Sequence, residues 1–398
     1  MIQIISTKLR IPFMKFQIPM ILFSTFLTGA ALYFIFTKGF NYGVDFEGGV
    51  QIVLSLPEGS KVDAEQLRKG FKDIGLPDAS VQAYGTQFDK KPHDFIVHFP
   101  ADFLDDGSAL AKVEQSLASS RPGDMAKDEK LVQQFRFVGL EKAYLTLSRP
   151  VNFEGLKKSV SGVDFGMLKF VEIAPFGRGS QNEFQIGFVG IGKTVTEALS
   201  KALGAETEVT IQKVDFVGAK VGSDLRTSAI LSLIIMIALI FVYIFVRFDL
   251  VYAPGVVLAL IHDVLITAGF FAMTGMEFDL TIVAALLTLA GYSINDTIVV
   301  YDRVRELSAT MKGKPFNEII DLSINQMLGR TIITGGSTFI ATLALWIFGG
   351  PVIHGFAIAF LIGIVVGTYS SVFIAAPTIA LSRKLLGVND ARLSKVAA

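Results

Sequence analysis

The sequence lacks cysteine altogether, and it contains only four histidines among its 398 residues. The absence of cysteine excludes disulfide frameworks, iron–sulfur clusters, thiolate zinc sites and cysteine nucleophiles. So few histidines argue against a metal site, and we expect neither a metal nor a cofactor. Lys and Arg number 36 and are balanced by 36 Asp and Glu, so the net charge is zero. This balance argues against nucleic acid as a partner, because phosphate binding requires a clustered cationic surface.

Charge of either sign is also scarce. Charged residues make up 18% of the chain, whereas ordinary soluble domains have about 25%. Hydrophobic residues make up 51%, and the mean hydropathy is +0.53. Six apolar runs approach or exceed the roughly 20 residues that cross a bilayer. They are Ile18–Phe36, Ser228–Val246, Leu250–Met273, Leu280–Tyr301, Thr331–Phe348 and Val352–Leu381. The sequence therefore predicts an α-helical membrane bundle of six transmembrane helices.

The spacing of these runs predicts the domain organisation. One helix (18–37) precedes an extracytoplasmic, periplasmic domain (38–225), and helices 2–6 follow as a block (226–382). Tails 1–17 and 383–398 lie at the two ends. Lys and Arg concentrate in both tails and between the fourth and fifth runs, so the positive-inside rule places both termini in the cytoplasm. A cleaved signal peptide is the alternative for the first run, but that run is long and no A-x-A site follows it.

The soluble domain contains an internal repeat. Residues 50–140 and 141–218 both have the order strand-helix-strand-strand-helix-strand, and both close on the tripeptide Phe-Val-Gly, at Phe137 and Phe216. That order is typical of the ferredoxin-like α+β fold, so we predict two such modules. The alternative is a chance similarity of two α+β stretches. Because the first and last strands both join membrane helices, we expect the modules to pack side by side or one inside the other, with residues 141–149 pairing outside their own repeat.

Ionisable side chains within the apolar runs carry the functional argument. Inserting one costs at least about 2.5–3.5 kcal/mol, so such a residue usually has a partner or a function. Asp296 lies in the fourth run, and Arg330 lies at or just inside the cytoplasmic start of the fifth. At similar depth on neighbouring helices, a carboxylate–guanidinium pair would offset both desolvation costs. A carboxyl switched between ionised and neutral forms by a mobile arginine would carry protons; the alternative is a static pair that joins two helices.

Three further polar residues extend this candidate proton relay. His262 and Asp263 lie in the middle of the third run, and Asn295 directly precedes Asp296. A neutral histidine hydrogen-bonded to an aspartate serves structure in a helix bundle as readily as it serves proton transfer. Both interpretations therefore stay open for His262 and Asp263.

Enzyme signatures are nearly absent. The patterns His-Glu-x-x-His, Gly-x-Ser-x-Gly and Gly-x-Gly-x-x-Gly do not occur in the sequence. Gly187–Thr194 matches the phosphate-binding P-loop pattern between a predicted strand and helix. It falls in the domain placed outside the cytoplasm, where ATP is scarce, so we interpret it as an ordinary glycine-rich loop. We expect a membrane transport component rather than an enzyme.

The stretch after the first apolar run, Asn41–Gly49, resembles the G-[IVL]-D-F-x-G-G signature of the SecD/SecF family of the bacterial protein-export machinery. Asp45, Phe46, Gly48 and Gly49 occupy its motif positions. The glycine pair permits a tight turn or a close backbone approach where the first run meets the first strand. Asp45 is a candidate cap of that turn, so we expect these residues to be structural.

The resemblance extends over both flanks of the soluble domain and all six apolar runs. Phe216–Leu225 has the pattern F-V-G-x-x-V-G-x-D-L directly before the second run. Ala259–Arg305 is similar to the SecF branch of the family, because SecD carries a different motif at the position of Asp296. The chain departs from the family in its soluble domain, which typically holds one ferredoxin-like unit. The extra residues lie roughly between Pro100 and Thr194.

The resemblance implies a function. In that family the residues that match Asp296 and Arg330 are tied to use of the proton motive force. A SecF-type subunit pairs with SecD in the inner membrane, as two halves of a bundle related to the RND transporters. The complex assists preprotein export through the SecYEG channel after the SecA stage, with YajC and YidC as further candidate partners. Whether the coupling ion is H⁺ or Na⁺ stays open.

Two other functions stand as alternatives. A stand-alone RND-like exporter of lipids or small molecules would need a second membrane half and an aromatic-lined pocket, whereas this chain supplies one half. A purely scaffolding subunit would hold a silent Asp–Arg pair, which only mutation distinguishes from a working one.

Overall fold

The computed structural model describes residues 10–57, 60, 62–84, 94–100, 106–117, 130–177, 182–203 and 209–386. The chain divides into two units: one consists of Met1–Gly43 and Leu225–Ala398, and the other of Val44–Asp224. Parts of the two predicted tails, residues 1–9 and 387–398, lie outside the described residues.

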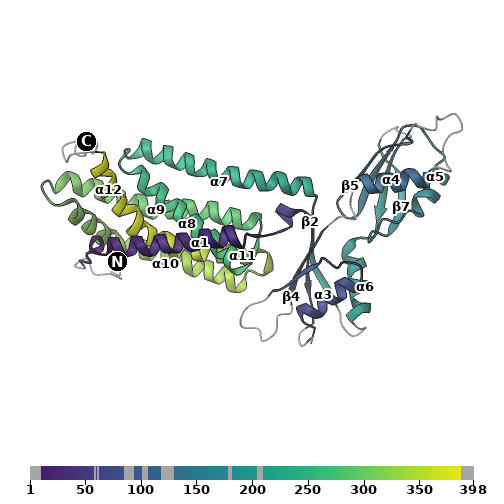
Figure 1. Ribbon diagram of the computed structural model, residues 1–398, viewed down its shortest axis with the longest axis horizontal. Coiled ribbons are helices and arrows are strands. Elements are labelled where there is room, and N and C mark those ends of the chain that lie inside the picture. Colours follow the sequence, from purple (N-terminus) through teal and green to yellow (C-terminus); the bar gives the residue numbers. More distant parts are fainter. Residues whose placement is uncertain are drawn as a thin grey trace. The chain divides into compact units, whose positions relative to one another are not determined.

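The first unit is a bundle of long apolar helices that run roughly along one another (Figure 1). Six of its described segments are long and apolar enough to cross a membrane, which confirms the prediction. The helices are η1 (Phe13–Phe16), α1 (Gln17–Thr37), α7 (Ala219–Arg247), α8 (Ala253–Thr274), α9 (Leu280–Thr310), α10 (Phe316–Phe348) and, joined end to end, α11 (Pro351–Ser370), the π-helical η4 (Ser371–Ala375) and α12 (Ala376–Leu385).

Local sequence explains the boundary between α8 and α9. Gly275 ends α8 with a φ of 72°, the left-handed conformation that glycine adopts without strain. Asp279 then caps α9, because its carboxylate accepts a hydrogen bond from the backbone N–H of Ile282 at 3.0 Å. In the loop between them, β10 (Glu277–Phe278) pairs in parallel with β1 (Asn41–Tyr42). This pairing joins the segment after α1 to the end of the bundle where α8 and α9 meet.

Two helices are longer than their apolar runs. α10 begins at Phe316 instead of Thr331, and α9 continues to Thr310 instead of Tyr301. Both extensions are rich in polar side chains, so a hydropathy window excludes them although no proline interrupts either helix. Arg330 therefore lies inside α10 and not at the start of the helix.

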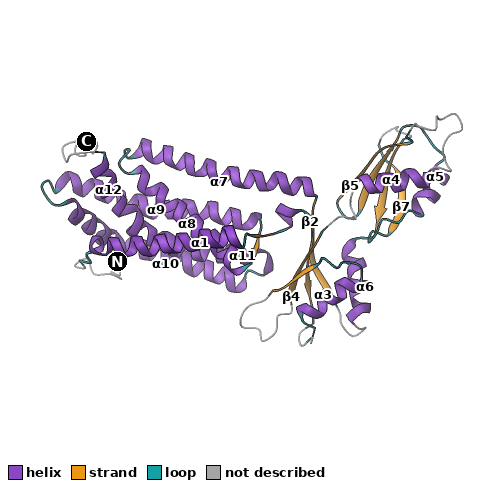
Figure 2. Ribbon diagram, viewed as in Figure 1, coloured by secondary structure: helices purple, strands orange, loops and turns teal. Residues whose placement is uncertain are grey.

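The second unit holds two four-stranded antiparallel sheets with two helices each (Figure 2). The first sheet has the order β3-β4-β2-β9, and α3 and α6 bury its core. The second has the order β5-β6-β8-β7 and buries its core beneath α4 and α5. The elements are β2 (Gly49–Ser55), α3 (Ala64–Asp73), β3 (Ser80–Tyr84), β4 (Asp94–Phe99), α4 (Asp106–Ser116), β5 (Val132–Val138), β6 (Lys142–Leu147), α5 (Phe153–Ser161), β7 (Phe170–Pro175), β8 (Glu183–Phe188), α6 (Ile191–Leu203) and β9 (Thr210–Val217).

The predicted order of elements is found twice, but the boundary predicted at residue 140 is wrong. Each repeat gives its closing helix and strand to the other sheet. The α4–β5 pair of the first repeat completes the second sheet, and the α6–β9 pair of the second repeat completes the first. One module is therefore inserted into the other, between β4 and α6. The first strand of the second repeat, β6, pairs outside its repeat with β5, as expected.

Chain connectivity explains this exchange. β2 and β9 lead to the membrane helices α1 and α7, and they pair directly, with Gly49 opposite Val217. β9 thus occupies the position beside β2 that β5 would otherwise take. β5 pairs instead with the next strand, β6, through a short turn in which Gly139 has a φ of 72°. Closing so short a loop costs less conformational entropy than a distant pairing.

Candidate functional site in the membrane helices

Asp296 lies on the buried side of α9, where the residue is 4% exposed. Its Oδ1 lies 3.5 Å from the hydroxyl oxygen of Thr334 on α10, which is a long contact. That hydroxyl is shared, because it also lies 3.0 Å from the carbonyl oxygen of Arg330. Asp296 Oδ2 is buried and has no hydrogen-bond partner among the described residues. An ionised carboxylate with so few partners is costly to bury.

Arg330 does not form the predicted ion pair. Among the described residues the carboxylate of Asp296 contacts Thr334 alone, and Arg330 is exposed. Depth along the helix explains the difference: Thr334 lies one turn after Arg330 on the same face of α10, and it is Thr334 that lies level with the carboxyl.

Asn295 is exposed, although it neighbours Asp296 in sequence. It lies at the end of an exposed stripe on α9 formed with Ala284, Thr288 and Gly291. At Gly291 no described atom would lie within 4 Å of an added Cβ. Small and polar residues on one face of a membrane helix favour close packing against another helix. The structure therefore separates Asn295 from the buried carboxyl and assigns it to an uncovered face.

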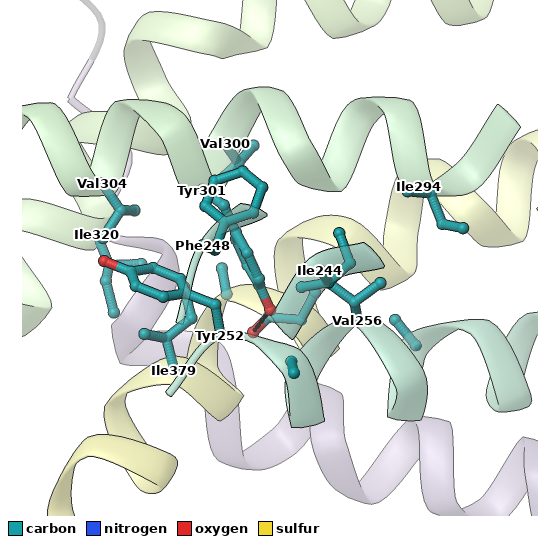
Figure 3. Close-up of a cluster of buried hydrophobic side chains, with 14 of the residues drawn as sticks. Ile244, Phe248, Tyr252, Val256, Ile294, Val300, Tyr301, Val304, Ile320 and Ile379 are labelled. Atoms are coloured by element: carbon teal, nitrogen blue, oxygen red, sulfur yellow. Dashed lines mark hydrogen bonds between the residues drawn. The ribbon is translucent and has the colours of Figure 1, made fainter. Parts of the chain in front are cut away.

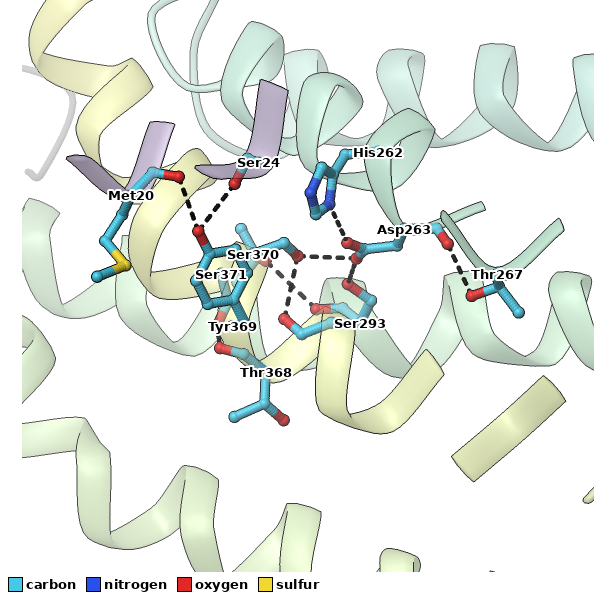
Figure 4. Close-up of polar contacts among 12 residues, drawn as sticks. Met20, Ser24, His262, Asp263, Thr267, Ser293, Thr368, Tyr369, Ser370 and Ser371 are labelled. Carbon is cyan, nitrogen blue, oxygen red and sulfur yellow. Dashed lines mark hydrogen bonds and ion pairs between the residues drawn. The ribbon is translucent and has the colours of Figure 1, made fainter. Parts of the chain in front are cut away.

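His262 and Asp263 form a second, fully buried polar cluster (Figure 4). Asp263 is 0% exposed, and its Oδ1 lies 2.9 Å from Nδ1 of His262. Its Oδ2 accepts hydrogen bonds from the hydroxyls of Ser293 on α9, at 2.6 Å, and Ser370 on α11, at 2.8 Å. Both oxygens of Asp263 are thus compensated, unlike those of Asp296.

An aromatic cluster packs α9 against η4 and the start of α8 (Figure 3). Tyr252, Tyr301 and Phe248 are buried with ring centroids 5.3–6.2 Å apart. The hydroxyl of Tyr301 donates to the carbonyl oxygen of Ala375, at the end of η4, at 3.0 Å. A Cβ added to Gly255 would collide with that hydroxyl, so the close approach requires glycine there.

Several residues of these clusters carry no chemical signal in the sequence. Thr334, Ser293 and Ser370 are hydroxyl side chains inside apolar runs, and such residues commonly bond only their own helix. Thr334 is four residues after Arg330, so helical spacing alone places it on the same face. The polar run Thr368–Ser371 within the last apolar segment was the available sign of a second cluster.

The P-loop match has the geometry of an ordinary strand and turn. Gly187, the first residue of the pattern, lies within β8 and pairs with Lys142 of β6. A carboxylate oxygen of Glu141 lies 2.8 Å from where a Cβ on Gly190 would be, next to the start of α6. An acidic side chain beside this loop disfavours phosphate there, because like charges repel. Among the described residues, no group of three or more His, Asp or Glu is arranged to hold a metal ion.

Comparison with known proteins gives the family. Residues 195–384 match the family model "Protein export membrane protein SecD/SecF, C-terminal", and residues 33–56 match "SecD/SecF GG Motif". The protein translocase subunit SecF of Calditerrivibrio nitroreducens is 34% identical over 357 residues, covering 89% of this chain and 88% of the relative. The SecF of Vibrio alginolyticus is 32% identical, covering 97% and 93%. This chain belongs to the SecF family of protein translocase subunits.

A solved SecF-containing structure supports the same assignment. The crystal structure of SecDF, a translocon-associated membrane protein from Thermus thermophilus, superposes with a TM-score of 0.64 at 25% identity. The match covers 96% of this chain and 40% of that longer chain. The family and the six candidate spans together show that this chain is a multi-pass membrane protein and a protein-transport component.

The GG motif of this SecF-family chain forms a tight turn. After a one-turn helix, α2 (Val44–Glu47), Gly48 and Gly49 have φ values of 75° and 121°. A Cβ on Gly49 would lie 2.7 Å from the carbonyl oxygen of Phe99, so glycine permits β2 to approach β4. Phe46 is buried beside this turn.

Proposed function

We propose that this chain works with a SecD subunit to couple the proton motive force to the late stages of preprotein export through SecYEG, and that Asp296 binds the transported proton. The observation that carries the proposal is the buried Oδ2 of Asp296, which has no hydrogen-bond partner among the described residues. Leaving a membrane-buried carboxylate in this state costs free energy, and residues that bear this cost usually have a function.

The surroundings of Asp296 support a carboxyl that changes its protonation state. Thr334 offers a long contact of 3.5 Å to Oδ1 and has two backbone acceptors in its own helix. No strong hydrogen-bond partner therefore fixes the carboxyl in its ionised or in its protonated form. Arg330 lies one turn before Thr334 on α10 and does not pair with Asp296, so a movement of α10 that brings its charge closer would favour the ionised form.

The uncovered stripe on α9 supports association with SecD. Ala284, Thr288, Gly291 and Asn295 lie exposed on one face of a helix whose other faces are buried. A second helical bundle packed against this face would cover Asn295 and lie close to the site of Asp296. This chain matches 40% of the related SecDF chain, so the rest of that chain is long enough to supply such a second half.

The membrane orientation follows from charge. Lys and Arg of the N-terminal tail, the α9–α10 connection and the end of α12 favour the cytoplasm, whereas the loop between α8 and α9 has none. We place the chain in the inner membrane, with both termini cytoplasmic and residues 44–224 in the periplasm. YajC and YidC are further candidate partners. Moving one proton across 100 mV supplies about 2.3 kcal/mol, enough to bias two helix arrangements of similar free energy.

Complementation tests the proposal. A strain depleted of its own SecF would receive wild-type chain or Asp296→Asn, and export would be followed by pulse-chase of a periplasmic preprotein. Asn keeps the volume of the side chain but cannot exchange a proton, so we expect the proton-driven part of export to be lost at normal abundance. Asp302→Asn is the matched control, since Asp302 is a half-exposed carboxyl on the same helix. Equal export by Asp296→Asn and wild type would refute the assignment.

A further inference from the structure

The hydroxyl of Ser370 has two acceptors and one proton to donate. Its Oγ lies 2.8 Å from Oδ2 of Asp263 and 3.1 Å from the carbonyl oxygen of Gly367. When Asp263 is ionised, the hydroxyl donates to the carboxylate. When Asp263 carries a proton, the acid donates to Ser370 Oγ, and the hydroxyl turns to Gly367. The second arrangement replaces a charge-assisted hydrogen bond by a neutral one, which is roughly half as strong.

The helix changes its hydrogen-bond register directly after Ser370. Ser371–Ala375 is π-helical, and the N–H of Ala376 bonds to the carbonyl oxygen of Ser371, five residues back. Such π turns are rare and often lie at functional sites. The far end of the π segment is bonded by Tyr301 of α9, whose hydroxyl donates to Ala375. Side chains from α8 and α9 thus hold the two ends of this segment.

The same cluster reaches α1. Tyr369, next to Ser370, packs its ring on His262 with centroids 6.3 Å apart. Its hydroxyl donates to the carbonyl oxygen of Met20 at 2.8 Å and lies 2.9 Å from the hydroxyl of Ser24. A movement of α11 at this level therefore acts on α1, which leads in sequence to the soluble unit.

We propose that Asp263 is a second proton-binding group, and that its protonation, relayed by Ser370, sets the register of the π segment Ser371–Ala375. The ionised carboxyl anchors the end of α11 to α8 and holds the π turn. A proton taken from the aqueous phase converts the carboxylate to the acid, weakens that anchor and allows the segment to adopt the α register. This inference rests on the proposed function in one respect only, namely that protons reach the site.

The ionisable and hydroxyl groups around Asp263 come from four helices. His262 contributes from α8 itself, and Tyr369 from α11. α9 presents the hydroxyl of Ser293, with Asp296 one turn further along. α1 contributes the hydroxyl of Ser24 through Tyr369. Any test must therefore separate Asp263 from His262 and Asp296.

Spin labels on either side of the π segment measure its register. The chain has no cysteine, so Val365→Cys on α11 and Leu381→Cys on α12, both exposed, label two positions of one continuous helix. A register change of one residue rotates the downstream part by about 100° and displaces it by about 1.5 Å along the axis. Pulsed electron paramagnetic resonance on the full chain in lipid nanodiscs, with and without SecD, would record the distance distribution at high and low pH.

We expect the labelled wild-type background to shift between two distance populations with pH. Asp263→Asn should remain at the low-pH population throughout, and Ser370→Ala should no longer respond to pH. Ser323→Ala is the matched control, because Ser323 is equally buried but bonds only within α10. It should shift as the background does. Infrared difference spectra should show a protonated carboxyl band that Asp263→Asn removes.

Two outcomes would overturn the proposal: no shift in the background, or a shift that persists in Asp263→Asn. A shift lost in His262→Asn and retained in Asp263→Asn would assign the titration to histidine and also overturn it. The test is separate from the export function. Asp296→Asn should keep the distance shift while losing proton-driven export, so a failure of either proposal leaves the other intact.

Discussion

Asp263 and Asp296 are both buried carboxyls on membrane helices, and their surroundings are opposite. Asp263 contacts a histidine and two serines from three helices. Asp296 has one long contact to a threonine, and one of its oxygens has no described partner. The comparison shows that two carboxyls that are both buried can differ widely in how well their charge is compensated. The number and strength of hydrogen-bond partners decide how much each protonation state costs.

The largest stability difference is expected between the two alanine variants. Asp263→Ala leaves His262 and the hydroxyl of Ser293 without their partner and Ser370 with Gly367 alone, so it should lower the free energy of unfolding by about 3–5 kcal/mol. Asp296→Ala removes one long contact and should cost less than about 1.5 kcal/mol, the scale of one ordinary hydrogen bond. Thermal unfolding of both variants in the same detergent measures the difference. Equal losses of stability in the two variants would contradict the difference in hydrogen bonding between Asp263 and Asp296.

A smaller effect is expected from removing one partner of Asp263. Ser370→Ala keeps the contacts to Ser293 and His262 and should cost about 1.5–3 kcal/mol, the range for a hydrogen bond to a charged group. Ser323→Ala, which removes a hydroxyl bonded within its own helix, should cost clearly less. The same unfolding assay compares the two, and a larger loss for Ser323→Ala would show that the Asp263 cluster is not what Ser370 stabilises.

Arg330 sharpens the comparison on the side of Asp296. Because the structure shows no direct ion pair, its charge should matter more than the planar fork of its guanidinium. Arg330→Lys should therefore keep most of the proton-driven export, whereas Arg330→Ala should lose most of it. Neither substitution should change stability much, because Arg330 is exposed in this chain. If Arg330→Lys exports as poorly as Arg330→Ala in the pulse-chase assay, the guanidinium must form a bidentate pair with Asp296 at some step of proton transport.

The sequence predicts the membrane unit well and the partners of its polar residues poorly. Runs of apolar residues locate six spans, because the bilayer imposes a length and a composition on each. The predicted pairing of Asp296 with Arg330 is wrong, because it depends on which turn of α10 lies level with Asp296, and hydropathy does not set that depth. The role of Ser370 is hard to predict, because hydroxyls in an apolar helix commonly bond only their own backbone.

In the second unit, Val44–Asp224, the order of elements is likewise easier to predict than their partners. Alternating strands and amphipathic helices predict the order of elements, because each reflects local periodicity. Which sheet β5 and β9 join depends on pairings between distant strands, such as Val50 with Phe216. Here the constraint from the membrane helices, which requires β2 and β9 to lie together, was the more informative argument.

The proposed coupling depends most on proton exchange at Asp296. The most direct measurement is export into inverted membrane vesicles that contain this chain and SecD, with and without an uncoupler that dissipates the proton motive force. Wild-type vesicles should export faster when the gradient is intact, and vesicles with Asp296→Asn should export at the uncoupled rate under both conditions. An Asp296→Asn protein that still responds to the uncoupler as wild type does would contradict the account.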